Sequence, residues 1–114
     1  MSDSIKKILE EYTKGLVKII GKNLKQVILY GSYVRNEQSN NGEVSNIDIM
    51  ILVDLPVDKI KVIEKRINDY SYDLDLKYNI LLSPFVENID NYNSRIKYMK
   101  FYENIEKEGV LLNV

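Results

Sequence analysis

The sequence predicts an α/β (α+β) fold, in which flanking helices cover a small mixed sheet. The first observation is that apolar residues recur with helical spacing in three separate segments. The second is that two short and nearly continuous apolar runs, 26–30 and 47–53, have the length of buried strands. The third is that helices and strands alternate along 114 residues without a repeat or a linker, which predicts a single domain, 1–114.

The three helices are predicted from their apolar stripes and from the residues that flank them. Asp3 or Ser4 is expected to cap the first helix, and Gly21 to end it. Pro56 is favoured at the first turn of the second helix, and Gly109 follows the third. The apolar stripes of the expected helices extend over residues 5–20, from residue 56 to a point between 70 and 76, and over residues 95–108.

Two further strands complete the predicted sheet. Residues 79–82 form the third strand, and Ser83-Pro84 is expected to stop it because proline cannot donate to a strand ladder. Residues 110–112 are expected to add a short strand after the last helix. The polar segment 35–46, between the first two strands, is interpreted as a surface loop.

The composition limits the possible chemistry. The chain has no cysteine and no histidine, so thiolate sites, disulfides and the commonest general base are excluded. A metal would need oxygen ligands, which favours Mg²⁺ or Mn²⁺. With 16 basic and 17 acidic residues the net charge is −1, which argues against direct nucleic-acid binding. The sequence shows no signal peptide and no run long enough for a membrane span, so a cytoplasmic protein is predicted.

Two short motifs hold the candidate functional residues. Gly31 and Ser32 follow the first strand, where a glycine lets backbone N–H groups approach a phosphate and a serine adds a donor. On the second strand, Asn46 and Asp48 point to the same side because side chains alternate. Two oxygen ligands on one face of a strand suit a Mg²⁺–triphosphate site.

Each motif also has an ordinary structural interpretation. A Gly-Ser turn after a strand is common, and a strand aspartate often lies at an edge or an end. The apolar run around Asp48 favours the functional interpretation, because burying a carboxylate is costly without a partner, and a metal ion is a suitable partner.

Residues 30–35 and 45–54 together resemble the motif of the minimal nucleotidyltransferases of the DNA polymerase β superfamily. That motif is Gly-Ser, a loop of about ten residues and Asp-x-Asp on a strand. The likeness extends over nearly the whole chain, because 76–84 and 101–110 are similar to the third strand and the C-terminal helix of stand-alone bacterial members.

The resemblance implies a polymerase β-like fold and a set of roles. Gly31 and Ser32 would hold the triphosphate of ATP, and Asp48 with position 46 would bind the metal. A third carboxylate on the later strand activates the acceptor hydroxyl in relatives. Many relatives pair with a HEPN-domain ribonuclease toxin as its antitoxin, in some cases by adding AMP to it. A HEPN-domain protein is therefore the expected partner.

Two of the departures from the family pattern affect the expected metal and base positions. Asn46 stands where the family has its first aspartate, and Asn79 is the position matched to the third carboxylate. Asparagine keeps an oxygen ligand but loses a full charge, so metal affinity should fall, and Asn79 cannot deprotonate a hydroxyl. Asp73 and Asp75 lie nearby but are expected on the solvated face of the preceding helix.

Two side-chain questions stay open from sequence alone. Arg35 can either neutralise a phosphate or pair with Glu37. The aromatic residues near the C-terminus are more typical of a core than of a base-stacking surface; they are Tyr92, Tyr98, Phe101 and Tyr102.

Two functions remain in competition, and whether the chain is an enzyme stays open. The first is transfer of AMP to a protein hydroxyl, weak because Asn46 and Asn79 replace carboxylates. The second is an inactive antitoxin subunit that neutralises a HEPN ribonuclease by contact. A nucleotidyltransferase acting on antibiotics is less favoured, because such enzymes need a further domain for the acceptor.

Overall fold

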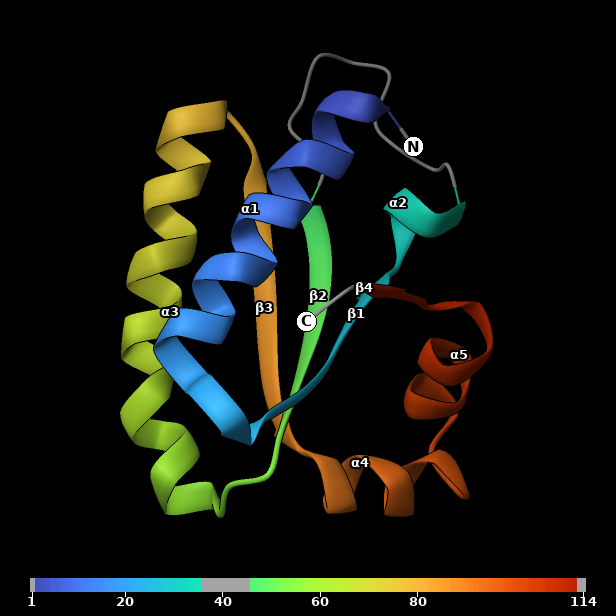
Figure 1. Cartoon of the computed structure of the whole chain (residues 1–114). Coiled ribbons are helices and arrows are strands. Elements are labelled where there is room, and N and C mark those ends of the chain that lie inside the picture. The colour runs from blue at the N-terminus through green and yellow to red at the C-terminus, as the bar shows by residue number, and fades with distance from the viewer. Residues whose placement is uncertain (1, 36–45, 113–114) are drawn as a thin grey trace.

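The computed structural model describes residues 2–35 and 46–112, and Figure 1 shows the arrangement of their helices and strands. The predicted loop 35–46 falls almost entirely outside these residues. The elements in chain order are α1 (Asp3–Ile20), the 3₁₀ turn η1 (Gly21–Asn23), β1 (Leu24–Tyr30), α2 (Ser32–Arg35), β2 (Asn46–Val53), α3 (Val57–Tyr78), β3 (Leu81–Asn88), α4 (Ile89–Ile96), α5 (Lys100–Glu108) and β4 (Val110–Leu112).

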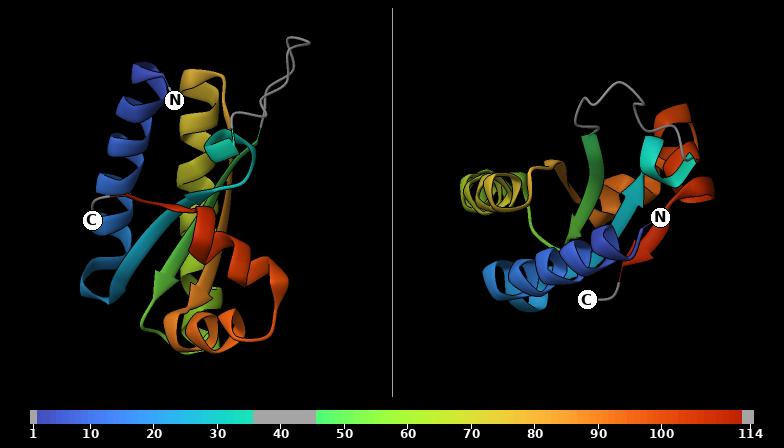
Figure 2. Two further views of the ribbon diagram at one scale, coloured as in Figure 1. Left: turned by 90° about the vertical axis from the view of Figure 1, so that its right-hand side faces the viewer. Right: turned by 90° about the horizontal axis from the view of Figure 1, so that it is seen from above.

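The four strands form one mixed sheet in the order β3-β2-β1-β4. β1 is antiparallel to both β2 and β4, whereas β2 and β3 are parallel and are joined by the long helix α3. Helices α1 and α3 cover one face of the sheet, and α4 and α5 pack against the other (Figure 2). The predicted mixed α+β fold is confirmed.

Strand β2 is the centre of the molecule because it is buried on both faces. Ile47, Ile49 and Ile51 pack in the core with α1 and α3. Met50 and Leu52 point to the opposite face, against α4 and α5. This burial on both sides explains why the sequence shows a continuous apolar run instead of an apolar–polar alternation.

The N-terminal cap differs from the prediction by a residue or two. Ser2 caps α1, and its hydroxyl oxygen accepts a hydrogen bond of 3.3 Å from the N–H of Ile5. A serine at this place satisfies one of the N–H groups that the first helical turn leaves without a partner. Gly21 ends the helix, as predicted, with φ of 73°.

The expected third strand is wrong at both ends. α3 continues to Tyr78, and Asn79 is its C-cap in the left-handed conformation, with φ of 52°. β3 then begins at Leu81 and runs through Pro84. The reason is that the N–H of Leu82 points away from β2, to Oδ1 of Asp75 at 2.8 Å. Pro84 lies two residues further along the same outer edge, where a missing N–H breaks no pair with β2.

The predicted last helix, 95–108, covers only the end of α4 (Ile89–Ile96) and the whole of α5 (Lys100–Glu108), which are two separate helices. α4 starts where Asn88 Oδ1 accepts hydrogen bonds from the N–H groups of Asp90 and Asn91, at 2.9 and 3.0 Å. It ends at Ile96, and α5 begins at Lys100. The predicted stripe is interrupted at Met99, which is 40% exposed and lies in the connection between α4 and α5.

A buried carboxylate holds the two helices against the sheet. Glu87 on β3 is 9% exposed. Its Oε2 accepts a hydrogen bond of 2.9 Å from the Tyr102 hydroxyl and pairs with Nη1 of Arg95 at 2.6 Å. One side chain on the sheet therefore connects α4 and α5, and this network sets where α5 lies.

We expect Glu87→Ala to lower the free energy of unfolding by about 1–3 kcal/mol, because two hydrogen-bonding groups lose a buried partner. Urea denaturation followed by circular dichroism measures the change. The control is Glu103→Ala, which removes an exposed ion pair with Lys107 on α5 and should cost less than about 1 kcal/mol. Equal losses in the two variants would contradict the role assigned to Glu87.

Candidate functional site

The site begins where the backbone of Gly31 meets the carboxylate of Asp48. Tyr30, the last residue of β1, pairs with Asp48 on β2. Gly31 follows with φ of 82°, which favours glycine. A Cβ at this position would collide with Oδ2 of Asp48. Gly31 is thus favoured by its backbone conformation, and any side chain at this position would have to displace the Asp48 carboxylate.

The turn after Gly31 carries the other two residues of the first motif. The N–H groups of Val34 and Arg35 donate to the carbonyl of Gly31, at 3.1 and 3.3 Å, which closes the short helix α2. Ser32 opens this helix, and Arg35 ends it. Both residues therefore lie at the same end of the sheet as Asp48.

A cleft of about 250 Å³ lies beside this contact, and α5 forms its far wall. On the side of the sheet, residues of β1, α2 and β2 and the turn at Gly31 line the cleft. On the other side, α5 contributes four residues at helical spacing. The complete lining is Tyr30, Gly31, Arg35, Asp48, Phe101, Asn104, Ile105 and Glu108. The sequence predicted none of the α5 residues here; their spacing indicated a helix face but not which part of the sheet it would cover.

Charged groups of both signs meet across the cleft. Nη1 of Arg35 lies 3.4 Å from Oε2 of Glu108, so α2 and α5 are joined by an ion pair between half-exposed side chains. Burial raises the pKa of the Asp48 carboxyl above its ordinary value, and the Arg35 cation opposes that rise. Asp48 is thus a partly buried carboxylate whose charge its protein surroundings do not fully compensate.

The pKa of Tyr30 is raised to about 12, first by burial, then by the negative charge of Asp48, and last by the neighbouring Tyr102. Its hydroxyl therefore stays protonated at neutral pH. Tyr30 is consequently a neutral part of the cleft floor and not a candidate base.

Asn46 lies on the same face as Asp48, as alternation predicted, but at the exposed first position of β2. Its neighbour on β3 is Leu81, and the neighbour of Asp48 is Ser83. Phe85 and Glu87 contact residues of α5, so the odd-numbered residues of β3 face the cleft side. The residues of the third strand next to Asn46 and Asp48 are therefore Leu81 and Ser83, and both are neutral.

This register corrects the position assigned to Asn79. Asn79 lies before β3, four residues ahead of the position that pairs with Asp48, and it does not line the cleft. Asp75 lies on α3, and its carboxylate accepts from the N–H of Leu82. Burial raises the pKa of Asp75, and this hydrogen bond partly offsets the rise. Asp73 is exposed on α3, as expected.

The donors near Asp48 limit the metal they could hold. Within residues 2–35 and 46–112, no group of three or more acidic, histidine or cysteine side chains could bind an ion. At the paired starts of β2 and β3, the side-chain oxygens on the cleft side are the carboxylate of Asp48, the amide of Asn46 and the hydroxyl of Ser83. Magnesium is often bound by one or two carboxylates together with substrate phosphates and water. The donor set fits one Mg²⁺ that arrives with a triphosphate, and it does not fit a tightly held pair of ions.

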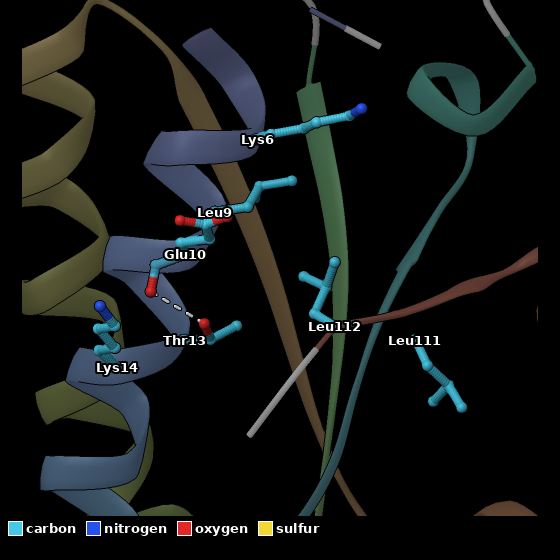
Figure 3. Close-up of a pocket in the computed structure, with 7 residues that line it drawn as sticks. All are labelled: Lys6, Leu9, Glu10, Thr13, Lys14, Leu111 and Leu112. Atoms are coloured by element: carbon cyan, nitrogen blue, oxygen red, sulfur yellow. Dashed lines mark hydrogen bonds between the residues drawn. The ribbon is translucent and has the colours of Figure 1, made fainter. Parts of the chain in front are cut away.

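A larger cavity of about 370 Å³ lies between α1 and the edge strand β4 (Figure 3). Leu9 and Leu112 form its apolar part, and Lys6 and Lys14 lie at its border. The hydroxyl of Thr13 donates to the carbonyl of Glu10 within α1. The residues that line this cavity include no glycine turn with a carboxylate beside it. The smaller cleft beside Gly31 and Asp48 is therefore the better candidate site.

A mixed sheet with a glycine turn at the end of one strand and a carboxylate against it on the next defines the class of small nucleotidyltransferase folds. The sequence comparison agrees with this class. The chain belongs to the family described as "Nucleotidyltransferase domain", whose model matches residues 4–112.

Three proteins of Methanocaldococcus jannaschii are similar to this chain. "Putative protein adenylyltransferase MJ0141" is 37% identical over an alignment 106 residues long, which covers 90% of this chain and 93% of the relative. A second protein of the same designation, MJ0604, is 30% identical over 93% of this chain and 95% of its own. A third, MJ0126, is 34% identical over 74% and 80%. Among the helices of the described ranges, none has the length and apolar content to cross a membrane.

The contact between Gly31 and Asp48 can be tested with a double-mutant cycle. Gly31→Ala should lower the free energy of unfolding, and part of this loss should be recovered in the Gly31→Ala/Asp48→Ala variant, because the colliding carboxylate is gone. We expect a coupling of about 0.5–3 kcal/mol, measured by urea denaturation.

The control cycle uses Gly21, which also has a positive φ but has open space where a Cβ would lie. Gly21→Ala should be destabilising through the backbone alone and additive with Asp48→Ala. Additive effects in both cycles would contradict the steric role of Asp48 at Gly31.

The raised pKa of Asp48 predicts a stability change that depends on pH. Because the folded protein disfavours the charged form, this carboxylate lowers stability at neutral pH, and the effect disappears as pH falls below its unfolded value of about 3.9. Asp48→Asn should therefore raise the free energy of unfolding at pH 7 and leave it unchanged near pH 3. Urea titrations in a chelator at both pH values measure this, with Asp73→Asn on exposed α3 as control. A stability loss at pH 7 would contradict the interpretation.

Proposed function

We propose that this chain transfers AMP from ATP to a protein hydroxyl with release of pyrophosphate, and that its acceptor is a HEPN-domain partner. The observation that carries the proposal is the Asp48 carboxylate lying against the Gly31 turn, in a cleft that also contains Arg35. Membership of the nucleotidyltransferase family supports the reaction class. Similarity to relatives whose name is protein adenylyltransferase supports AMP as the transferred group. The HEPN partner and the bacterial stand-alone type rest on the resemblance of the sequence motifs.

In this proposal, Gly31 and Ser32 hold the phosphates and Arg35 neutralises part of their charge. The pair between Arg35 and Glu108 would then exchange for a pair between Arg35 and a phosphate, at modest cost because the ion pair is half exposed. Asp48, with Asn46 as a neutral second ligand, would hold Mg²⁺. The metal supplies charge neutralisation at the phosphates during in-line displacement.

The weak element of this site is proton removal from the acceptor hydroxyl. On β3 the neighbours of Asn46 and Asp48 are Leu81 and Ser83, and neither can accept a proton at neutral pH. General base catalysis typically contributes about 10²–10⁴-fold. We therefore expect transfer by the unmodified chain to be slow.

The alternative is an inactive antitoxin subunit that neutralises a HEPN ribonuclease by contact. The neutral residues at 46, 81 and 83 favour it, because they leave Asp48 as the one carboxylate among these four neighbouring positions. The retained Gly31 turn and the packed Asp48 favour the enzyme. The two functions predict different effects on AMP transfer when carboxylates are introduced at these neutral positions.

We expect Asn46→Asp combined with Ser83→Asp to increase AMP transfer by about 10²–10⁴-fold, because a base then lies on the strand next to Asp48. Transfer of label from α-labelled ATP to a purified HEPN partner measures it. Asn46→Asp combined with Leu81→Asp tests the other candidate position on β3. The matched control is Asn46→Asp combined with Asn79→Asp, which adds the same charges but places the second one before the strand.

The outcomes separate the two functions. Fast transfer by the unmodified chain would show that Asp48 suffices and that the site is not impaired. No transfer by any variant that remains folded and binds Mg-ATP would support inhibition by contact instead. A gain in the Asn79 control equal to that of the Ser83 variant would contradict the register argument.

A further inference from the structure

Phe101 on α5 combines exposure with a fixed orientation. Its side chain lines the cleft, and the residue is 45% exposed. Three aromatic rings surround it: Tyr30 edge-on with centroids 5.9 Å apart, Tyr102 edge-on at 5.3 Å, and Phe85 at 6.3 Å with 29° between the ring planes. Aromatic contacts of this geometry are favourable and restrict the ring. The cleft therefore has an aromatic wall that is held in place although water reaches it.

The other C-terminal aromatic residues do not share this position. Tyr92 and Tyr102 are buried at 1% and 5% exposure, as a core role predicts. Tyr98 is 73% exposed but lies in the turn between α4 and α5. Phe85 on β3 is 39% exposed and lies beside Phe101. Two adjacent, partly exposed phenylalanine rings are thus placed where the cleft meets the third strand.

The wall changes from aromatic to charged along one face of α5. Phe101, Asn104 and Glu108 all line the cleft and are spaced at helical intervals. Seven residues of helix separate the first from the last, a rise of about 10 Å. Glu108 lies at the end that pairs with Arg35, beside the Gly31 turn. The wall thus has a charged end, an amide in the middle and an aromatic end, the same order as the triphosphate, ribose and base of a nucleotide.

We propose that Phe101, supported by Phe85, is the surface on which the base of a purine nucleoside triphosphate stacks. This rests on the proposed function, which supplies the triphosphate at the other end of the cleft. A volume of about 250 Å³ is below the ~300–1,000 Å³ typical of sites that enclose a whole small ligand. The cleft accordingly takes part of the nucleotide, and the rest extends from its mouth.

The competing occupant of this wall is an apolar side chain of a protein partner. The two occupants, a stacked base and a protein side chain, predict different effects of the Phe101 ring on ligand affinity. A stacked base makes affinity for ATP depend on Phe101 while affinity for inorganic tripolyphosphate does not. If a protein side chain is the occupant, Phe101 affects the affinity for neither small ligand.

The test is calorimetric titration of Mg-ATP and of Mg-tripolyphosphate into the whole chain. Phe101→Leu keeps an apolar side chain against Tyr102 but removes the ring face. We expect it to weaken Mg-ATP binding by about 5- to 150-fold, the range that stacking of one base on an aromatic ring is worth. Binding of tripolyphosphate should be unchanged. Phe101→Trp should retain Mg-ATP affinity, and Tyr98→Ala, which removes an exposed aromatic outside the cleft, should have no effect.

Each result has a definite meaning. Unchanged Mg-ATP affinity in Phe101→Leu, with loss in Asp48→Ala, would overturn the stacking surface and leave the proposed function standing. An equal loss for both ligands in Phe101→Leu would show that the ring acts only by holding the cleft in shape, which also overturns the proposal. If the unmodified chain bound Mg-tripolyphosphate and bound Mg-ATP no more tightly, stacking would be overturned. If it bound neither, the proposed function would fail as well.

Discussion

The close approach of Gly31 to the carboxylate of Asp48 is the constraint on which the rest of the site depends. It requires that β1 and β2 stay paired up to Tyr30 and Asp48 and that the chain turn with a positive φ directly afterwards. No residue with a Cβ fits there without moving the carboxylate. The backbone of the turn and the acidic side chain are thereby held together before any ligand is present, which lowers the cost of ordering a site around them.

The burial of β2 on both faces holds Asp48 at the rim of the sheet. Residues after it pack alternately against α1 and α3 or against α4 and α5, so the strand cannot slip by one residue without turning apolar side chains to the wrong face. The opposite wall is held differently, through Glu87 and its contacts with Arg95 and Tyr102. Apolar packing thus positions the carboxylate, and a buried polar network positions the helix across from it.

Strand β3 matters both for the outer edge of the sheet and for the candidate site. Asp75 takes up the outward N–H of Leu82, and Pro84 has none, so the outer edge offers few donors to another strand. The same strand presents Leu81 and Ser83 beside Asn46 and Asp48, where a metal-dependent transferase would gain from carboxylates. The third strand therefore places neutral side chains beside Asn46 and Asp48.

The sequence by itself determined the elements whose signals are local. Helical spacing located α1 and the start of α3, the apolar run located β2, and alternation put Asn46 and Asp48 on one side. Gly31 and Asp48 were chosen as candidates from their motifs because a glycine turn and a carboxylate within an apolar run are visible in a short window.

Only the tertiary structure decided what lies opposite them. The register of β3 moved the third-strand position from Asn79 to Leu81 and Ser83, and the packing of α5 brought Phe101 and Glu108 to the cleft. Arg35 pairs with Glu108, 73 residues away in the chain, whereas Glu37, its neighbour in sequence, lies outside the described residues. Periodicity reports which face of an element is buried, but register and helix placement depend on contacts between distant segments, and a local pattern contains no information about those.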